Sequence, residues 1–160
     1  MASISSFAKD KNDLYNLFNQ KVRNNAGIYS INLYSSLGVP VKVIVDDKIP
    51  FNSSLQPAFA KFSADKEIWP ILLEKAVAKL VGNYDMIQSG TPIDGMFMLN
   101  GGPGFFYLNS SKTAALIYTD IINFLAQGFF IQCQNNVTQL GLIGGHAYSI
   151  LGAYTLSNGV

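Results

Sequence analysis

The chain has very few of the residues that build metal and disulfide sites. Its 160 residues include one cysteine, Cys133, and one histidine, His146. A single cysteine cannot form an internal disulfide, and one cysteine with one histidine cannot make a Cys-rich or His-rich zinc site. Charged residues are also scarce, at 13% against roughly 25% in an average soluble domain, and the net charge is +1. This charge gives no electrostatic reason to expect nucleic acid or an acidic membrane as a partner.

Charge is absent from the last quarter of the chain, since residues 121–160 contain no Asp, Glu, Lys or Arg. Polar residues such as Asn123, Gln127 and Gln132 nevertheless interrupt this segment before the roughly 18 apolar residues of a membrane span accumulate. The first seven residues, MASISSF, lack the pattern of a secretory signal peptide. We therefore expect a cytoplasmic protein without a membrane span. Its surface is built from Asn, Ser, Gln and Gly, or part of it is covered by a partner.

The hydrophobic pattern predicts an α+β fold. Apolar spacing predicts helices over residues 10–22, 68–81 and 111–127, the last capped by Ser111. β-Branched and aromatic residues predict a hairpin of residues 28–34 and 39–45, and later apolar runs predict strands over 129–133 and 147–154. The segment 90–104 is rich in Gly and Pro, which predicts an irregular joint and a lobe boundary near Gly101 and Gly102.

Five short strings, in their order along the chain, carry a resemblance to a known family. They are Ala26-Gly-Ile-Tyr-Ser with Val41-Lys-Val-Ile-Val-Asp-Asp-Lys-Ile-Pro50, Trp69-Pro-Ile-Leu-Leu-Glu-Lys-Ala-Val-Ala-Lys79, Gly82-Asn-Tyr84, Asn100-Gly-Gly102 and Gly145-His-Ala-Tyr-Ser149. Together they resemble the protease core of the calpain family, a branch of the papain-fold cysteine proteases. Gly82-Asn-Tyr84 resembles the end of a helix of that core, and Asn100-Gly-Gly102 resembles its Gly-Gly subdomain junction. Gly145-His-Ala-Tyr-Ser149 resembles the string that holds its catalytic histidine.

The resemblance implies an incomplete papain-like core, with part of a helical lobe in residues 1–102 and the beginning of a β-rich lobe in residues 103–160. It implies that His146 occupies the position of the general base. It also implies that Gly101, Gly102 and Gly145 lie where backbone groups line the cleft and bind an extended substrate, although plain turns explain these glycines equally well. Partners are then protein or peptide substrates.

The resemblance implies peptide hydrolysis by a nucleophilic cysteine, a histidine and an asparagine, but the nucleophile is not evident in this chain. Residues 1–7 resemble the continuation of the family's catalytic helix, so the cysteine is expected shortly before Met1 and the asparagine beyond Val160. Cys133 lies in the apolar run Phe-Phe-Ile-Gln-Cys, far from any charge that would stabilise a thiolate, and reads as a buried structural cysteine. We therefore expect this chain alone to be inactive in peptide hydrolysis.

Calcium, on which the family depends, is not expected to bind. Phe97 aligns with a glutamate of the helical-lobe calcium site, and a phenyl ring supplies no oxygen ligand. Asp46, Asp47 and Asp94 are read as strand-end or loop carboxylates, so no metal site is predicted. Three hypotheses remain open: a piece of a calpain-type cysteine endopeptidase, a non-catalytic pseudoprotease that binds proteins, and a remnant without a stable fold.

Overall fold

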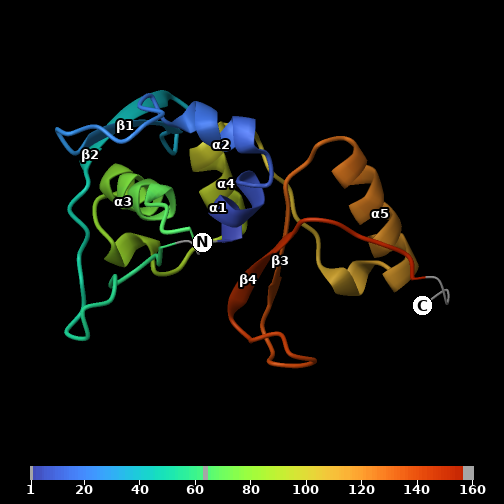
Figure 1. Cartoon of the computed structure of the whole chain (residues 1–160). Coiled ribbons are helices and arrows are strands. Elements are labelled where there is room, and N and C mark those ends of the chain that lie inside the picture. The colour runs from blue at the N-terminus through green and yellow to red at the C-terminus, as the bar shows by residue number, and fades with distance from the viewer. Residues whose placement is uncertain (1, 63–64, 157–160) are drawn as a thin grey trace.

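A computed structural model of the chain describes residues 2–62 and 65–156 (Figure 1). Helices and two small sheets alternate along it, so the predicted α+β class is confirmed. The elements, in order, are α1 (Ala2–Phe7), α2 (Lys11–Leu17), β1 (Ile28–Tyr34), β2 (Pro40–Asp46), α3 (Trp69–Val81), the 3-10 turn η1 (Asp85–Ile87), α4 (Pro92–Asn100), the 3-10 turn η2 (Asn109–Ser111), α5 (Ala114–Ala126), β3 (Ile131–Asn135) and β4 (His146–Ile150).

The predicted hairpin is the first sheet. β1 and β2 pair antiparallel with Ile28 opposite Asp46 and Tyr34 opposite Pro40. The turn closes where the Gly38 N–H donates to the Ser35 carbonyl at 2.9 Å, with Gly38 at φ +74°. Because alternate residues of a strand point to opposite faces, Tyr29, Ile31 and Leu33 all face the core, and each is at most 4% exposed.

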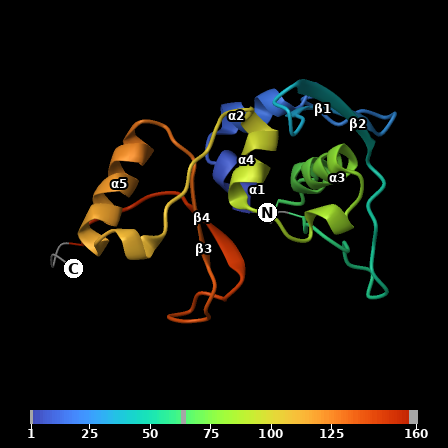
Figure 2. The same ribbon diagram turned by 180° about the vertical axis from the view of Figure 1, so that it is seen from behind.

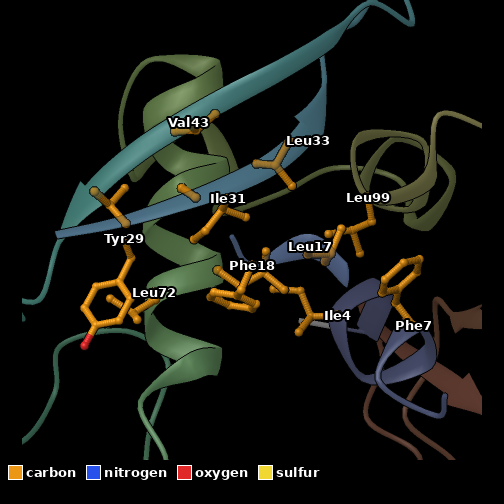
Figure 3. Close-up of a cluster of buried hydrophobic side chains, with 13 residues drawn as sticks. Ile4, Phe7, Leu17, Phe18, Tyr29, Ile31, Leu33, Val43, Leu72 and Leu99 are labelled. Carbon is orange, nitrogen blue, oxygen red and sulfur yellow. The ribbon is translucent and has the colours of Figure 1, made fainter. Parts of the chain in front are cut away.

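α3, which corresponds to the helix predicted over residues 68–81, covers the inner face of this hairpin. Pro70 lies in its first turn, where the missing N–H removes no hydrogen bond, and Gly82 follows its last residue. Leu72, Leu73 and Ala76 are buried against the sheet in one cluster with residues of β1 and β2 (Figure 3). This cluster is the core of the molecule.

α4 is a correction to the prediction of an irregular joint over residues 90–104. The Thr91 hydroxyl accepts from the Asp94 N–H at 3.2 Å and donates to the Asp94 carboxylate at 2.7 Å, which caps the helix start. Pro92 occupies the first turn, and Gly101 ends the helix at φ +68°. The Pro and Gly residues that suggested irregularity are thus the start and stop signals of a helix.

Two other helices differ from prediction at their ends. α2 stops at Leu17 instead of continuing to residue 22, because Phe18 turns to an extended conformation and forms a β-bridge with Ile31. The N-cap of α5 lies two residues later than predicted, since the hydroxyl of Thr113 accepts from the Leu116 N–H and takes the capping role expected of Ser111.

The later part of the chain is built differently from the earlier part. Every buried residue of the described chain lies at or before Leu99. α5 stands apart from the core, with the β3–β4 hairpin between them, and both views show this arrangement (Figures 1 and 2). The predicted lobe boundary at residue 102 stays a prediction, but the core lies wholly on one side of it. No helix in the described ranges is long and apolar enough to cross a membrane.

Candidate functional site

His146 is the first residue of β4 and lies opposite Asn135 of β3. Its side chain is exposed. The residue before it, Gly145, has φ +71°, and its N–H donates to the Asn135 carbonyl at 2.6 Å. This left-handed turn, which favours glycine, directs the chain into β4 at His146.

Tyr148 is the aromatic neighbour of His146. The two rings meet edge to face with centroids 5.0 Å apart and an interplanar angle of 83°. The Tyr148 hydroxyl also accepts a hydrogen bond from the Ile143 N–H at 2.7 Å. One side chain therefore contacts both the imidazole and the loop that precedes it.

A small cavity of about 170 Å³ adjoins His146. Its lining combines residues of the β3–β4 hairpin with one residue from the loop before α4, and consists of Gly90, Gln134, Asn135, Asn136, Gly145, His146 and Ala147. The cavity therefore lies where the hairpin meets the earlier part of the chain. Main-chain groups and carboxamides dominate the lining, which suits hydrogen bonding to a polypeptide backbone.

α1 fastens the hairpin to the rest of the molecule. The Ser149 hydroxyl of β4 donates to the Ala2 carbonyl at 2.7 Å, and the Ser6 hydroxyl donates to the Ile131 carbonyl at 3.4 Å. The Ser3 hydroxyl donates to the Pro92 carbonyl at 3.0 Å, which joins α1 to the start of α4. The hydrogen bond from Ser149 therefore attaches the start of α1 to β4, three residues after His146. Sequence reasoning missed this junction, for which the only local signal is the Ser3, Ser6 spacing on one helix face.

Cys133 lies on β3, opposite Tyr148. It is half-buried, and burial raises the pKa of its thiol. A raised pKa keeps the thiol protonated at neutral pH, which is the reverse of what a nucleophilic cysteine needs. This agrees with the structural role predicted for Cys133, although the residue is less buried than expected.

Gln132, next to Cys133, was not singled out by the sequence. Its cross-strand partner is Ser149, so its side chain shares the hairpin face that contacts α1. The Gln132 Nε2 atom is buried and has no hydrogen-bond partner within the described ranges. An unpaired buried amide costs free energy of folding, so the contact between α1 and the hairpin leaves one polar group without a hydrogen bond among the described residues.

The glycines predicted to line the cleft fall in two places. Gly145 lines the cavity beside His146, whereas Gly101 and Gly102 are not among its lining residues. A Cβ on Gly101 would meet the Tyr34 ring at 2.6 Å, and the Gly102 N–H donates to the Asn100 side chain at 2.8 Å. The end of α4 therefore accounts for both, and their contact with substrate stays a prediction.

The residues present do not fit a calcium site. The tip of the Phe97 ring lies against the β1–β2 turn, where a Cβ on Gly38 would be 3.3 Å from it. Asp94, read as a loop carboxylate from the sequence, instead lies in the first turn of α4 and accepts from Thr91. Among the described residues, no group of three or more His, Cys, Asp or Glu side chains is arranged to hold a metal ion.

A sequence model described as calpain family cysteine protease matches residues 1–159. The chain belongs to the calpain family. Among its curated relatives, it is 34% identical to the calpain-type cysteine protease DEK1 of Zea mays over 140 residues, covering 80% of this chain and 6% of that protein. It is 31% identical to Calpain-8 of Mus musculus over 164 residues, covering 95% of this chain and 23% of that protein. The resemblance found in the five strings is confirmed.

The calpain-family chain spans less than a quarter of the length of these relatives. It also matches the calpain-2 catalytic subunit of Gallus gallus at 31% identity over 137 residues, again only 19% of that protein. The mixed helices and small sheets fit a partial calpain protease core. This match alone therefore does not assign the activity, substrates or partners of a whole calpain to this chain.

Proposed function

We propose that this chain carries the histidine side of the active site of a calpain-type cysteine endopeptidase, with His146 as the general base and acid. The observation that supports this most is the setting of His146. It is an exposed imidazole at a cavity lined from two parts of the molecule, on the strand whose Ser149 holds the start of α1.

In this proposal the imidazole takes a proton from a cysteine thiol, the thiolate attacks the scissile carbonyl, and His146 returns the proton to the leaving amine. Cys133 is a poor candidate for that thiol because its pKa is raised by burial. The proposal therefore requires a thiol that this sequence does not supply, and the 160 residues alone are expected to be inactive.

We further propose that the substrates are proteins or peptides bound in extended form. The carboxamides of Gln134 and Asn136, which line the cavity, would bind such a chain. Gly101 and Gly102 would then extend the binding surface. A cytoplasmic location remains part of the proposal, since it rests on the sequence alone.

A second candidate is a non-catalytic pseudoprotease that binds a protein partner. One observation favours it: Phe97, which the resemblance aligns with a calcium-binding glutamate, supplies no oxygen ligand, and its ring lies against the β1–β2 turn. This observation does not depend on where the chain starts or stops.

The deciding experiment isolates the natural protein from its source with an antibody to the exposed 52–56 loop. Intact mass and hydrolysis of a fluorogenic peptide are then measured on the same sample. We expect a species heavier than 17.4 kDa that hydrolyses peptide. His146→Gln should lower its rate by at least about 10²-fold, the lower end for a general base, while Cys133→Ser should leave the rate unchanged. A stable species of 17.4 kDa without hydrolysis would favour the non-catalytic function instead.

A further inference from the structure

A second, larger hollow lies away from His146, between the β1–β2 hairpin and α3. Its volume is about 480 Å³, within the roughly 300–1,000 Å³ usual for small-molecule sites. None of its lining residues belongs to the cavity at His146. The hairpin and α3 lie at the opposite side of the molecule from α5 in both views, with β4 between them (Figures 1 and 2). We call this hollow the α3 groove.

The apolar part of the α3 groove comes from both elements. Val45 and Ala78, which are 4% and 1% exposed, form its closed side. Ile28 and Ile44, on the outer face of the hairpin, are each about half exposed and stand at its rim. Removing these two isoleucines from water would favour an apolar ligand, at roughly 25 cal/mol per Å² of surface buried.

The two lysines of the groove differ in how many of their ammonium N–H donors already make hydrogen bonds. The Lys75 ammonium lies 2.5 Å from an Asp46 carboxylate oxygen and also donates to the carbonyls of Asp46 and Lys48. Its three donors are therefore occupied. The Lys79 ammonium donates only to the Ile44 carbonyl, at 2.8 Å, within the described part of the chain. Two of its donors remain for a ligand.

Two further donors line the same groove. The Asn83 side-chain oxygen accepts from the Met86 N–H, which leaves its NH₂ group without a partner among the described residues. The Tyr84 hydroxyl likewise has no partner in the described ranges, while its ring stacks on Phe59 with centroids 4.0 Å apart. Burial, with the charges of Glu74 and Asp46, raises the pKa of Tyr84, so the hydroxyl stays protonated and able to donate.

The charge of the groove selects among anions. Its lining holds two ammonium groups and one carboxylate, and the Glu74 carboxylate lies outside the lining but near enough to raise the pKa of Tyr84. Within the described residues, Lys79 is the lysine of the lining whose ammonium makes no ion pair with a carboxylate. A monocarboxylate would neutralise it, whereas a phosphate would bring nearly two negative charges to one free lysine. Free donors, one ammonium group outside any ion pair among the described residues, and apolar walls are thus complementary to one kind of molecule.

We propose that the α3 groove binds a small organic monocarboxylate, whose apolar body covers Ile28 and Ile44 and whose carboxylate is bound by Lys79. Asn83 and Tyr84 supply the further hydrogen bonds. This site is independent of His146 and does not require the chain to be catalytic.

The test titrates the full chain with octanoate and follows its ¹H–¹⁵N spectrum. Octanol and octylamine have the same apolar body with a neutral and a cationic head, and serve as matched probes. We expect signals of Ile44, Lys79 and Gly82 to move, octanoate to bind about threefold more tightly than octanol, and octylamine to bind least, since a charge-assisted hydrogen bond at an exposed lysine adds modestly to affinity. Octanol binding as tightly as octanoate would overturn the proposal.

Variants distinguish binding at the groove from nonspecific hydrophobic binding. Lys79→Met keeps the apolar stem and should weaken octanoate about threefold without changing octanol. Lys42→Met, on the same hairpin but outside the groove, should change neither. Tyr84→Phe keeps the stack on Phe59 and should weaken octanoate a few-fold. Unchanged octanoate affinity in Lys79→Met, or signals that move on α5 instead of the groove, would refute the site.

Discussion

Within the described residues, the imidazole of His146 has one aromatic neighbour. Tyr148 meets the imidazole edge to face at 5.0 Å and accepts a hydrogen bond from Ile143 in the loop before it. The ring and the hydroxyl therefore do separate things: the ring limits where the imidazole lies, and the hydroxyl ties the loop to the strand. A movement of the loop at Ile143 would act on Tyr148 and hence on His146.

This division can be measured because His146 is the only histidine, so the chain has one set of imidazole proton signals. Tyr148→Phe should leave those signals nearly in place, since the ring contact remains. It should speed hydrogen exchange at the Ile143 amide, whose partner is lost. Tyr148→Leu should move the imidazole signals toward those of a free histidine. Unmoved imidazole signals in Tyr148→Leu would contradict the positioning role.

At the residue scale, the sequence predicts roles from short strings but not contacts across the chain. Gly145-His146 is identified from five residues, and the strand after it follows from local pattern. The bond from Ser149 to Ala2 joins residues 147 positions apart, so no local pattern contains it. The orphaned Gln132 amide depends on the same packing and is equally invisible in the sequence.

At the element scale, α3 fastens the open edge of β2 as well as covering its face. Lys75 and Lys79 reach the carbonyls of Asp46 and Ile44, which would otherwise be open to pairing with another strand. The hydrogen bond from Lys75 holds the pKa of Asp46 below its ordinary value of 3.8, with smaller contributions from the Lys48 N–H and from charge. The folded state therefore favours the ionised carboxylate.

A lowered pKa in the folded state makes stability depend on pH in one direction. The contribution of Asp46 is fully present above the ordinary value of 3.8 and is lost as pH falls through the lower, folded value. Lys75→Met should therefore cost about 0.5 kcal/mol at pH 6, because an exposed pair is worth roughly 0–1 kcal/mol. The difference should shrink at a pH well below 3.8, as the carboxylate is protonated on passing the lowered pKa of Asp46. The part due to the hydrogen bonds from Lys75 to the carbonyls of Asp46 and Lys48 should remain. Urea unfolding at both pH values tests this, with Lys42→Met as control, and an equal loss at both would contradict it.

The elements that the sequence predicts well are those whose pattern and tertiary role agree. α3 and the β1–β2 hairpin follow from periodicity because each buries the face that its pattern marks as apolar. α4 escapes prediction because a helix of nine residues between Pro and Gly carries too little periodicity to outweigh those residues. α2 is shortened by a long-range event, the bridge from Phe18 to Ile31.

At the scale of the molecule, none of the apolar residues after Leu99 is buried in the part of the chain that the structure describes. α3 and α5 are both 13 residues long and both apolar, yet six residues of α3 are buried and none of α5. Exposed side chains continue along that part of the chain, including Phe106 at 80% and Leu140 at 98%. Composition alone does not predict this asymmetry, because it counts apolar residues without saying which of them meet.

The asymmetry predicts that equal truncations in the two helices have unequal costs. Leu73 of α3 is 0% exposed, so Leu73→Ala should destabilise the chain by about 2–5 kcal/mol through lost burial and the cavity left behind. Ile122 of α5 is 38% exposed, and Ile122→Ala should cost less than about 1 kcal/mol because most of its surroundings are already water. Denaturant unfolding followed by the fluorescence of Trp69, the single tryptophan, reports on α3 directly, and amide exchange extends the comparison to α5. Equal costs for the two variants, or α5 amides as protected as those of α3, would mean that α5 belongs to a cooperative core shared with α3.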